Sequence, residues 1–305
     1  MMHSEKITYL SKRIILALAL FVQYITPKLI VMKRSIILMA GIVLLASFSS
    51  KEPDSLDVVN NESFDTGEEI EFKMSFGIFT IGKAKMKIHP TIHNVNYRGC
   101  YKVDIWGKTS GMVDWVSRVD DNWGAYVDTI SLVPHISYRK IKEGSYRKNE
   151  LVKFDHTTNN IEVKTVDKET GKFKEPMYYA SPMENVRSMI SGMMYLRTID
   201  FDAMTVGDTL TMSGFFEDEF YDLDIIYKGK GKVKTKAGKF NAIMLVPIVP
   251  DNKLFDGENS VTAWISDDKN RLPLKVEADM FIGNAGVEII KYKGVKNPIN
   301  FYKKE

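Results

Sequence analysis

An alternation of apolar and charged residues from Ile70 to Ile88 constrains the fold of this chain more than any other feature. All charged residues of this stretch stand at odd-numbered positions, and most even-numbered positions are apolar. A period of two residues is typical of strands with one buried face. Because the stretch is longer than a usual strand, we expect a bend or hairpin at Gly77 or Gly82.

Shorter β-type segments follow and are separated by turn sequences such as Asp256-Gly257 and Asp267–Asn270. Together they predict a mainly β protein, with a strongly curved antiparallel sheet or half-barrel of about 11–13 strands. The expected strands after the first stretch are Tyr101–Ile105, Leu132–Ile141, Tyr146–Asp155, Ile161–Val166, Thr209–Phe216, Tyr221–Lys228, Gly231–Lys236, Asn241–Val249, Val261–Ser266, Pro273–Asp279 and Val287–Lys293. Residues Val113–Val127 are expected to form a strand or a hairpin.

One segment in the middle of the chain has helical periodicity instead. Residues Ser181–Glu184 contain a capping serine, a proline suited to the first helical position and a glutamate that completes a capping box. The apolar side chains that follow are spaced as one helix face. We therefore predict one α-helix of about 14 residues that begins at this cap and packs on the concave face of the sheet. Its apolar face comprises Val186, Met189, Ile190 and Met193.

The N-terminal residues predict export. Residues 32–50 consist of a basic start, an apolar run and a small-residue tail, which is the layout of a secretory signal peptide. Residues 1–31 are interpreted as an upstream extension, with translation starting at Met32, and an uncleaved membrane anchor is the alternative. We expect 51–63 to be a flexible linker and 64–298 a single β-rich domain. The mature chain is then periplasmic or extracellular and soluble after cleavage near Ser50, without a stable membrane span.

Composition excludes several classes of function. Six basic residues and one acidic residue lie in the first 50, so the remaining chain has a formal net charge of −2 instead of +3 and no nucleic-acid surface is expected. Cys100 is the only cysteine, which rules out an intrachain disulfide. Hydrolase and nucleotide-binding motifs are absent. We expect no cofactor and no metal site, since Pro90 interrupts the helical spacing of His89 and His93.

The methionine-rich helix suggests a place for a ligand. Methionine fills irregular cores, but it also lines adaptable binding surfaces, so the helix either fills the concave face or leaves a cavity for an apolar ligand. The aromatic residues nearby are likewise typical of a core or of a binding surface. The candidate ligand-binding residues are Met189, Met193, Trp106, Trp115 and Phe215.

Alternating lysines form a second candidate surface. Lys228, Lys230, Lys232 and Lys234 are separated by small or apolar residues, so they share one face of a predicted strand. A charged exposed strand discourages edge-to-edge aggregation. The same lysines could instead contact an anionic surface such as lipid head groups or a polysaccharide.

Two further features each have a simple structural reading. The acidic residues Glu217–Glu219 are expected at a solvated hairpin tip, although carboxylates can also bind calcium. Asp267 is expected in a turn. An enzyme acting on envelope polymers would need two carboxylates about 5–9 Å apart, for which Asp267 and Glu217 are the candidates.

Several motifs together resemble the DUF3108 family of secreted bacterial proteins of unknown function. They are Gly67-Glu68 with Gly82–Ala84, Leu132–Pro134, Tyr195–Arg197, Thr235–Ala242, Trp264–Asp268 and Arg271–Leu274. The resemblance covers about Gly67 to Gly294 and implies no established reaction and no catalytic residues. The half-barrel shape that it implies is similar to periplasmic lipid- and lipoprotein-carrier folds, which is an analogy of fold alone.

Three hypotheses of function follow from the sequence. The first is a non-enzymatic envelope protein that binds an apolar or amphipathic ligand, such as a lipid, beneath its helix. The second is a structural or partner-binding module whose sheet edge accepts a strand of another envelope protein. The third is the carboxylate-dependent enzyme.

Overall fold

The computed structural model describes residues 56–111, 118–248, 260–280 and 283–302, all of which belong to a compact unit that spans Asp54–Glu305. The predicted extension and signal peptide lie outside these residues. The strands are β1 (Glu69–Phe76), β2 (Phe79–Val95), β3 (Arg98–Thr109), β4 (Asp120–Asp128), β5 (Pro134–Glu143), β6 (Tyr146–Asp155), β7 (Asn160–Thr165), β8 (Met177–Ala180), β9 (Thr209–Phe216), β10 (Glu219–Thr235), β11 (Gly238–Pro247), β12 (Val261–Ser266), β13 (Pro273–Met280) and β14 (Gly283–Lys293). One α-helix, α4 (Met189–Leu196), and a short 3-10 turn, η1 (Phe201–Ala203), lie between β8 and β9.

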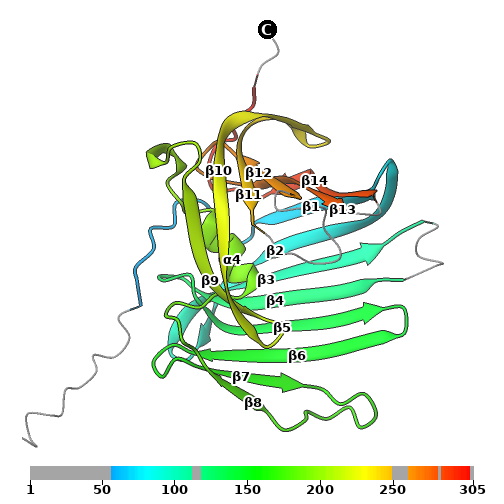
Figure 1. The fold of residues 1–305 in the computed structure, drawn as a ribbon, viewed down its shortest axis with the longest axis vertical. Coiled ribbons are helices and arrows are strands. Elements are labelled where there is room, and N and C mark those ends of the chain that lie inside the picture. Colours follow the sequence, from blue (N-terminus) through cyan, green and yellow to red (C-terminus); the bar gives the residue numbers. More distant parts are fainter. Residues whose placement is uncertain (1–55, 112–117, 249–259, 281–282, 303–305) are drawn as a thin grey trace, which may run out of the picture. The chain divides into compact units, whose positions relative to one another are not determined.

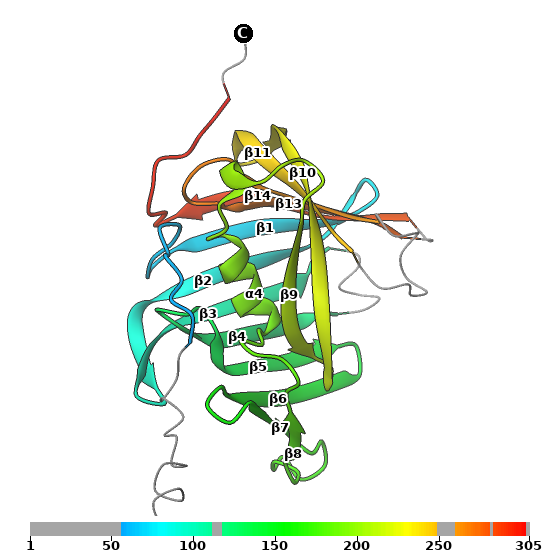
Figure 2. The same cartoon turned by 60° about the vertical axis from the view of Figure 1, so that its left-hand side comes forward.

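The fourteen strands of the described residues form one antiparallel sheet, which confirms the predicted fold class (Figure 1). Their order is β8-β7-β6-β5-β4-β3-β2-β1-β14-β13-β12-β11-β10-β9. Strands that are neighbours in sequence pair with each other, except that β8 and β9 end the sheet and do not pair, and β1 also pairs with β14. The sheet curls, so that β9 at one end faces β6 and β7 near the other, and α4 lies inside the curl (Figure 2).

The strand predictions were largely correct because buried and exposed residues alternate. The bend in the first stretch is at Gly77, whose φ of 53° is accessible to glycine, and Gly82 lies within β2. The two strands expected between Tyr221 and Lys236 are one strand, β10, with a bulge between Tyr227 and Lys230. β8 was not predicted, because its side chains are mostly exposed and show no alternation of buried and exposed positions.

The helix begins later than predicted. Asn185 has a positive φ of 52°, and Arg187 is bound to the edge of β9, where its N–H donates to Ser213 at 3.0 Å and its carbonyl accepts from Phe215 at 3.0 Å. A residue whose backbone is engaged in this way cannot join a helix. The capping box is formed instead by Ser188 and Ser191, so that α4 has eight residues.

The core surrounds α4. One cluster joins Ile190 and Met194 to β1–β4, β13 and β14, and a second joins Tyr195 and Leu196 to β9–β12. A third cluster places Phe215 of β9 against β6 and β7. The helix therefore fills the inside of the curl, and its side chains pack between the two halves of the sheet.

The C-terminal end of α4 is fixed by a buried ion pair. Arg197 donates to both carboxylate oxygens of Glu68 at 2.6 and 2.8 Å, and it also donates to the carbonyl of Asn270. Both charged side chains are almost fully buried. Residues 59–63, part of the predicted linker, also contact the domain, since Val59 packs on the core and the Ser63 hydroxyl donates to the Arg197 carbonyl at 2.6 Å.

The convex face contains a close contact that fixes the middle of the sheet. Asp104, Gly124 and Tyr138 are paired in one row across β3, β4 and β5. The Tyr138 ring lies over Gly124, so that its hydroxyl donates to the buried Asp104 at 2.8 Å. A Cβ atom on Gly124 would stand 2.1 Å from this ring.

We therefore predict that Gly124→Ala displaces Tyr138 and lowers the free energy of unfolding by about 2–4 kcal/mol, through overpacking and loss of a hydrogen bond to a charged group. Urea denaturation measures this. Gly107→Ala is the matched control in the neighbouring strand, since nothing lies within 4 Å of its added Cβ. Equal effects of the two substitutions would contradict the assignment.

Candidate functional site

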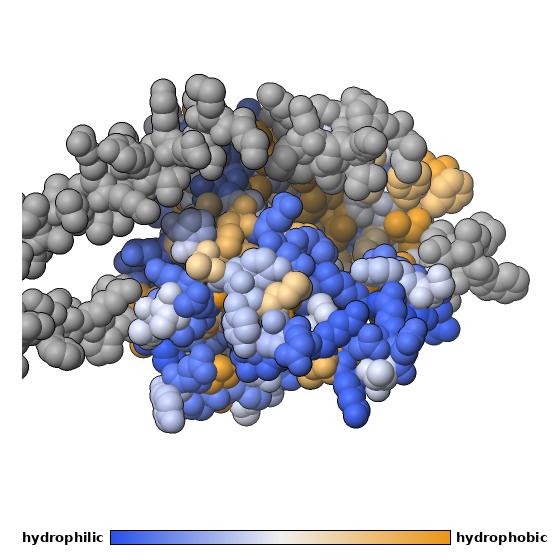
Figure 3. Space-filling model, turned by 60° about the horizontal axis from the view of Figure 1, so that its bottom comes forward, coloured by the Kyte–Doolittle hydropathy of each residue, from blue (hydrophilic) through white to orange (hydrophobic). Residues whose placement is uncertain are grey.

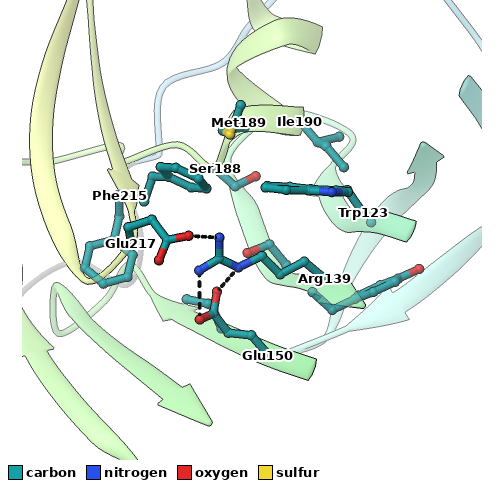
Figure 4. A pocket seen from close by; sticks show the side chains of 13 residues that line it. Trp123, Arg139, Glu150, Ser188, Met189, Ile190, Phe215 and Glu217 are labelled. Carbon is teal, nitrogen blue, oxygen red and sulfur yellow. Dashed lines mark hydrogen bonds and ion pairs between the residues drawn. The ribbon is translucent and has the colours of Figure 1, made fainter. Parts of the chain in front are cut away.

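The candidate site lies beneath α4, where β4, β5 and β6 face the turn between β9 and β10 (Figure 4). Trp123, Arg139 and Glu150 are paired in one row across the three strands, on the concave face. Met189 and Ile190 of α4 lie above this row. The strand residues of the site thus occupy alternate positions whose side chains face the concave side of the sheet.

Arg139 is the centre of the site. Its side chain is 6% exposed, and its Nε and Nη2 atoms donate to the two carboxylate oxygens of Glu150 at 2.6 and 3.0 Å. Its Nη1 atom donates to Glu217, which comes from the β9–β10 turn. The guanidinium also lies 5.5 Å from the ring centre of Trp123 and 5.0 Å from that of Phe216. Arginine is suited to such bidentate and stacked contacts.

Lys148 completes a four-residue charge cluster, which we call the clasp: Arg139, Lys148, Glu150 and Glu217. The Lys148 ammonium lies 3.0 Å from a carboxylate oxygen of Glu150 and 3.0 Å from one of Glu217. The hydrogen bond from Arg139 lowers the pKa of Glu217 to about 2. Burial opposes the charge on Arg139, but Glu217 and Glu150 outweigh it and raise the pKa of Arg139.

The cavity at this site is small. Its volume is about 40 Å³, close to the space of one water molecule. Figure 3 views the molecule from the side that is lowest in Figure 1 and shows a mainly hydrophilic surface with hydrophobic residues in the hollow behind it. In this conformation the concave face has no room for a lipid chain at the clasp.

The predicted ligand-binding residues are not all brought together. Met189 is half exposed beside the clasp, Phe215 is buried against β6 and β7, and Met193 packs on the core cluster of β1–β4. Trp106 follows the inward-facing Ile105, so it lies on the convex face, and its assignment to this cavity was wrong. Trp115 lies outside the described residues.

The predicted lysines are exposed on β10, as expected for a charged strand. Lys230 forms ion pairs with Asp202 and Asp267, and the Lys232 ammonium lies 5.4 Å from the ring centre of Tyr302. Lys228 and Lys234 are also exposed. Contact of these lysines with an anionic surface stays a prediction.

The two carboxylates considered for an enzyme have different partners. Asp267 lies in the connection between β12 and β13, where it pairs with Arg271 at 3.2 Å and Lys230 at 3.1 Å. Glu217 belongs to the clasp. Among the described residues, no group of three or more His, Cys, Asp or Glu side chains is arranged to hold a metal ion.

Arg139, Lys148 and Glu150 were not predicted as site residues from the sequence. Their positions in the strands nevertheless indicated that they face inward. Arg139 stands two residues before the buried Ile141. Lys148 and Glu150 likewise stand at even distances from the buried Val152. Charged residues at the inward positions of neighbouring strands indicate a buried ion pair.

A second and larger hollow, of about 460 Å³, lies at the ends of β5–β8. Arg98 and His135 line it and also bind the buried Asp128, which accepts from His135 at 3.2 Å. Burial disfavours the charge of Asp128, but these hydrogen bonds outweigh it and lower the pKa of the carboxyl group. On the same hollow, Lys153 and Glu162 pair at 3.3 Å. Many of its charges are therefore already engaged within the protein.

The comparisons with known proteins agree with this fold. The family described as protein of unknown function DUF3108 matches residues 71–290, and the chain belongs to this family. The resemblance stated above is thus confirmed. No curated protein sequence matches the chain. Within the described residues, no helix is long and apolar enough to cross a membrane.

Three solved structures match this chain to different degrees. A β-barrel-like protein of the DUF1849 domain from Brucella abortus has a TM-score of 0.50 at 10% identity, over 76% of this chain and 98% of that one. A protein from Bacteroides fragilis described as exported, with a YmcC-like fold, has a TM-score of 0.31 at 10% identity, over 77% and 99%. A protein from Parabacteroides distasonis described as a lipoprotein has a TM-score of 0.29 at 9% identity, over 78% of this chain and 100% of that one.

The clasp generates a pH prediction. Because the pKa of Glu217 is lowered from 4.5 to about 2, its contribution to stability is present above pH 4.5 and is lost as the pH falls towards 2. Glu217→Gln should then lower the free energy of unfolding by about 1 kcal/mol at pH 7, the scale of a half-exposed ion pair, and by much less at pH 2.

Urea denaturation of both proteins at several pH values measures this difference. Glu219→Gln removes the same charge two residues away, where the side chain is exposed, and serves as the control. A Glu217→Gln effect that is independent of pH would show that the carboxylate charge does not hold the turn.

Proposed function

We propose that the protein is an exported, non-enzymatic binding protein for an amphiphile with an anionic head group, which binds at Arg139 beneath α4. The observation that carries the proposal is the contact between the buried Arg139 and Glu217. One donor of this guanidinium is satisfied by a carboxylate from a turn at the other end of the sheet, and the guanidinium lies against two aromatic rings.

The charges of the clasp support an anionic ligand. Glu150 accepts from Arg139 within neighbouring strands, while Glu217 reaches both Arg139 and Lys148 from a separate segment. Without Glu217, two cations would face one carboxylate. A ligand phosphate or carboxylate would restore the charge balance and accept the same hydrogen bonds. Glu217 therefore occupies the position of the ligand's head group.

The turn that carries Glu217 is under backbone strain. Glu217 and Asp218 both have positive φ values, 51° and 67°, in a two-residue hairpin turn that normally selects Asn-Gly. Such a conformation costs about 1–2 kcal/mol for each residue other than glycine. Strain of this kind is common at functional sites. The strained turn, which connects the paired residues Phe216 and Glu219, is thus a candidate functional segment.

The surroundings suit an apolar tail. Trp123 and Phe216 stack with ring centres 5.9 Å apart, and Met189 and Ile190 face them from α4. Displacement of the β9–β10 turn would open the cavity between these side chains. β9 is the last strand of the sheet, and the backbone of Arg187 binds its outer edge at Ser213 and Phe215, so the displaced part would be the turn beyond Phe215.

The proposal predicts that Glu217→Ala increases affinity for an anionic amphiphile, because it removes an internal competitor. Dodecyl phosphate should bind this variant of the full chain at least about tenfold more tightly than the wild type, a gain of about 1.4 kcal/mol. Isothermal titration calorimetry measures the affinity. Dodecanol, which has the same tail without the charge, should show no such gain.

Glu219→Ala is the matched control and should bind dodecyl phosphate like the wild type. Arg139→Gln should abolish the gain when combined with Glu217→Ala. If wild type and Glu217→Ala bind dodecyl phosphate and dodecanol equally, or bind neither, the proposed function is wrong.

The open edge of β8 supports a second candidate, the partner-binding module. Among the strands that the structure describes, β8 pairs only with β7, so its outer edge ends the sheet. The side chains of Met177 and Tyr178 are exposed. A partner strand added here would slow amide hydrogen exchange in Met177–Ala180. Exchange rates in β8 that stay unchanged when envelope proteins are added would exclude this edge.

A further inference from the structure

The turn between β1 and β2 exposes two large apolar side chains. Ile78 is 93% exposed and Phe79 is 63% exposed, and Gly77 before them has a positive φ of 53°. The turn is visible at the right-hand side of Figure 1, beyond the label of β1. Exposed apolar residues that occur singly are common, but two adjacent ones at the end of a hairpin indicate contact with an apolar phase.

A row of lysines crosses the strands that lead to this turn. Lys73 of β1 is paired directly with Lys83 of β2, and Lys83 with Lys108 of β3, on the convex face. Like charges directly opposite each other are destabilising. Glu288 neutralises Lys73 at 2.8 Å and Asp120 neutralises Lys108 at 3.2 Å. Lys83, in the centre, forms no ion pair among the described residues and is exposed.

The lysine row borders a hollow of about 310 Å³. Its lining combines three lysines and one carboxylate with apolar surface. The charged residues are Lys83, Lys85, Lys108 and Glu71, and the apolar surface includes Trp106 and Ile290. Tryptophan and lysine together are typical of proteins at the boundary between water and lipid head groups. Trp106 lines this hollow on the opposite face of the sheet from the clasp.

The spacing of these features fits a lipid bilayer. Lys83 stands four residues after Phe79, which corresponds to about 13 Å along a strand. A side chain that enters the boundary between head groups and acyl chains lies about 5–10 Å deep. With Ile78 and Phe79 at this depth, the lysine row lies at the level of the lipid phosphates.

We propose that the β1–β2 hairpin binds the surface of anionic phospholipid membranes, with Ile78 and Phe79 inserted and Lys83, the centre of the lysine row, on the lipid phosphates. This surface is separate from the clasp and does not depend on the function proposed there. It lies at the β1–β2 turn, whereas the clasp joins β5 and β6 to the β9–β10 turn.

A fluorescent label on the hairpin tests the proposal. Ile78→Cys in the full chain is labelled with the polarity-sensitive dye NBD. The native Cys100 does not compete, because it is buried and its burial, together with Asp128, raises the pKa of the thiol to about 12. Tyr97→Cys is the matched control, since Tyr97 is fully exposed at the opposite end of β2.

NBD emission at position 78 should rise and shift to shorter wavelength with vesicles of phosphatidylcholine and phosphatidylglycerol. It should change little with phosphatidylcholine alone or at position 97. Lys83→Gln in the same labelled chain should weaken vesicle binding about fivefold, the effect of one lysine at an anionic surface.

An unchanged emission at position 78 with anionic vesicles, in a protein that retains its thermal unfolding transition, would overturn the proposal. Equal changes at positions 78 and 97 would do the same, because binding would then not involve the hairpin. Since dodecyl phosphate binding is measured separately, failure of the hairpin and failure of the clasp are distinguishable.

Discussion

The arrangement of the concave site depends on a contact between two distant parts of one curled sheet. β5 is fourth and β9 fourteenth in the order of strands, yet Arg139 of β5 binds Glu217 at the end of β9. The right-handed twist of antiparallel strands accumulates into such a curl. The two ends of the curl are joined by side-chain contacts and not by a continuous ladder of backbone hydrogen bonds. A closure made by ion pairs and aromatic contacts can open without loss of the strand pairing, which is the basis of the proposed ligand exchange.

The helix sets the distance between the two halves of the curl. Its C-terminal end is tied to the start of β1 through Arg197 and Glu68, which are both buried and hydrogen-bonded to each other. A buried ion pair adds little net stability, because desolvation of the charges opposes their attraction. Its directional bonds nevertheless specify one position for the helix end. The position of Met189 and Ile190 above the clasp follows from this tie.

Most of the fold was predictable from the sequence, since a sheet with one buried face has a period of two. The start of α4 was not, because Arg187 is bound to β9, a contact between distant segments that overrides the local capping signal. Trp106 was assigned to the wrong face although its neighbour Ile105 gave the correct parity. The clasp could not be predicted from local patterns, because it depends on the pairing of β5 with β6 and on the contact of β5 with the end of β9.

The central claim is that Glu217 occupies the place of an anionic head group at Arg139. The most direct measurement is a crystal structure of the Glu217→Ala variant grown with dodecyl phosphate. The account predicts the phosphate within hydrogen-bond distance of the Arg139 guanidinium and the tail against Trp123 and Phe216. A structure in which the β9–β10 turn is unmoved and only water contacts Arg139 would contradict it.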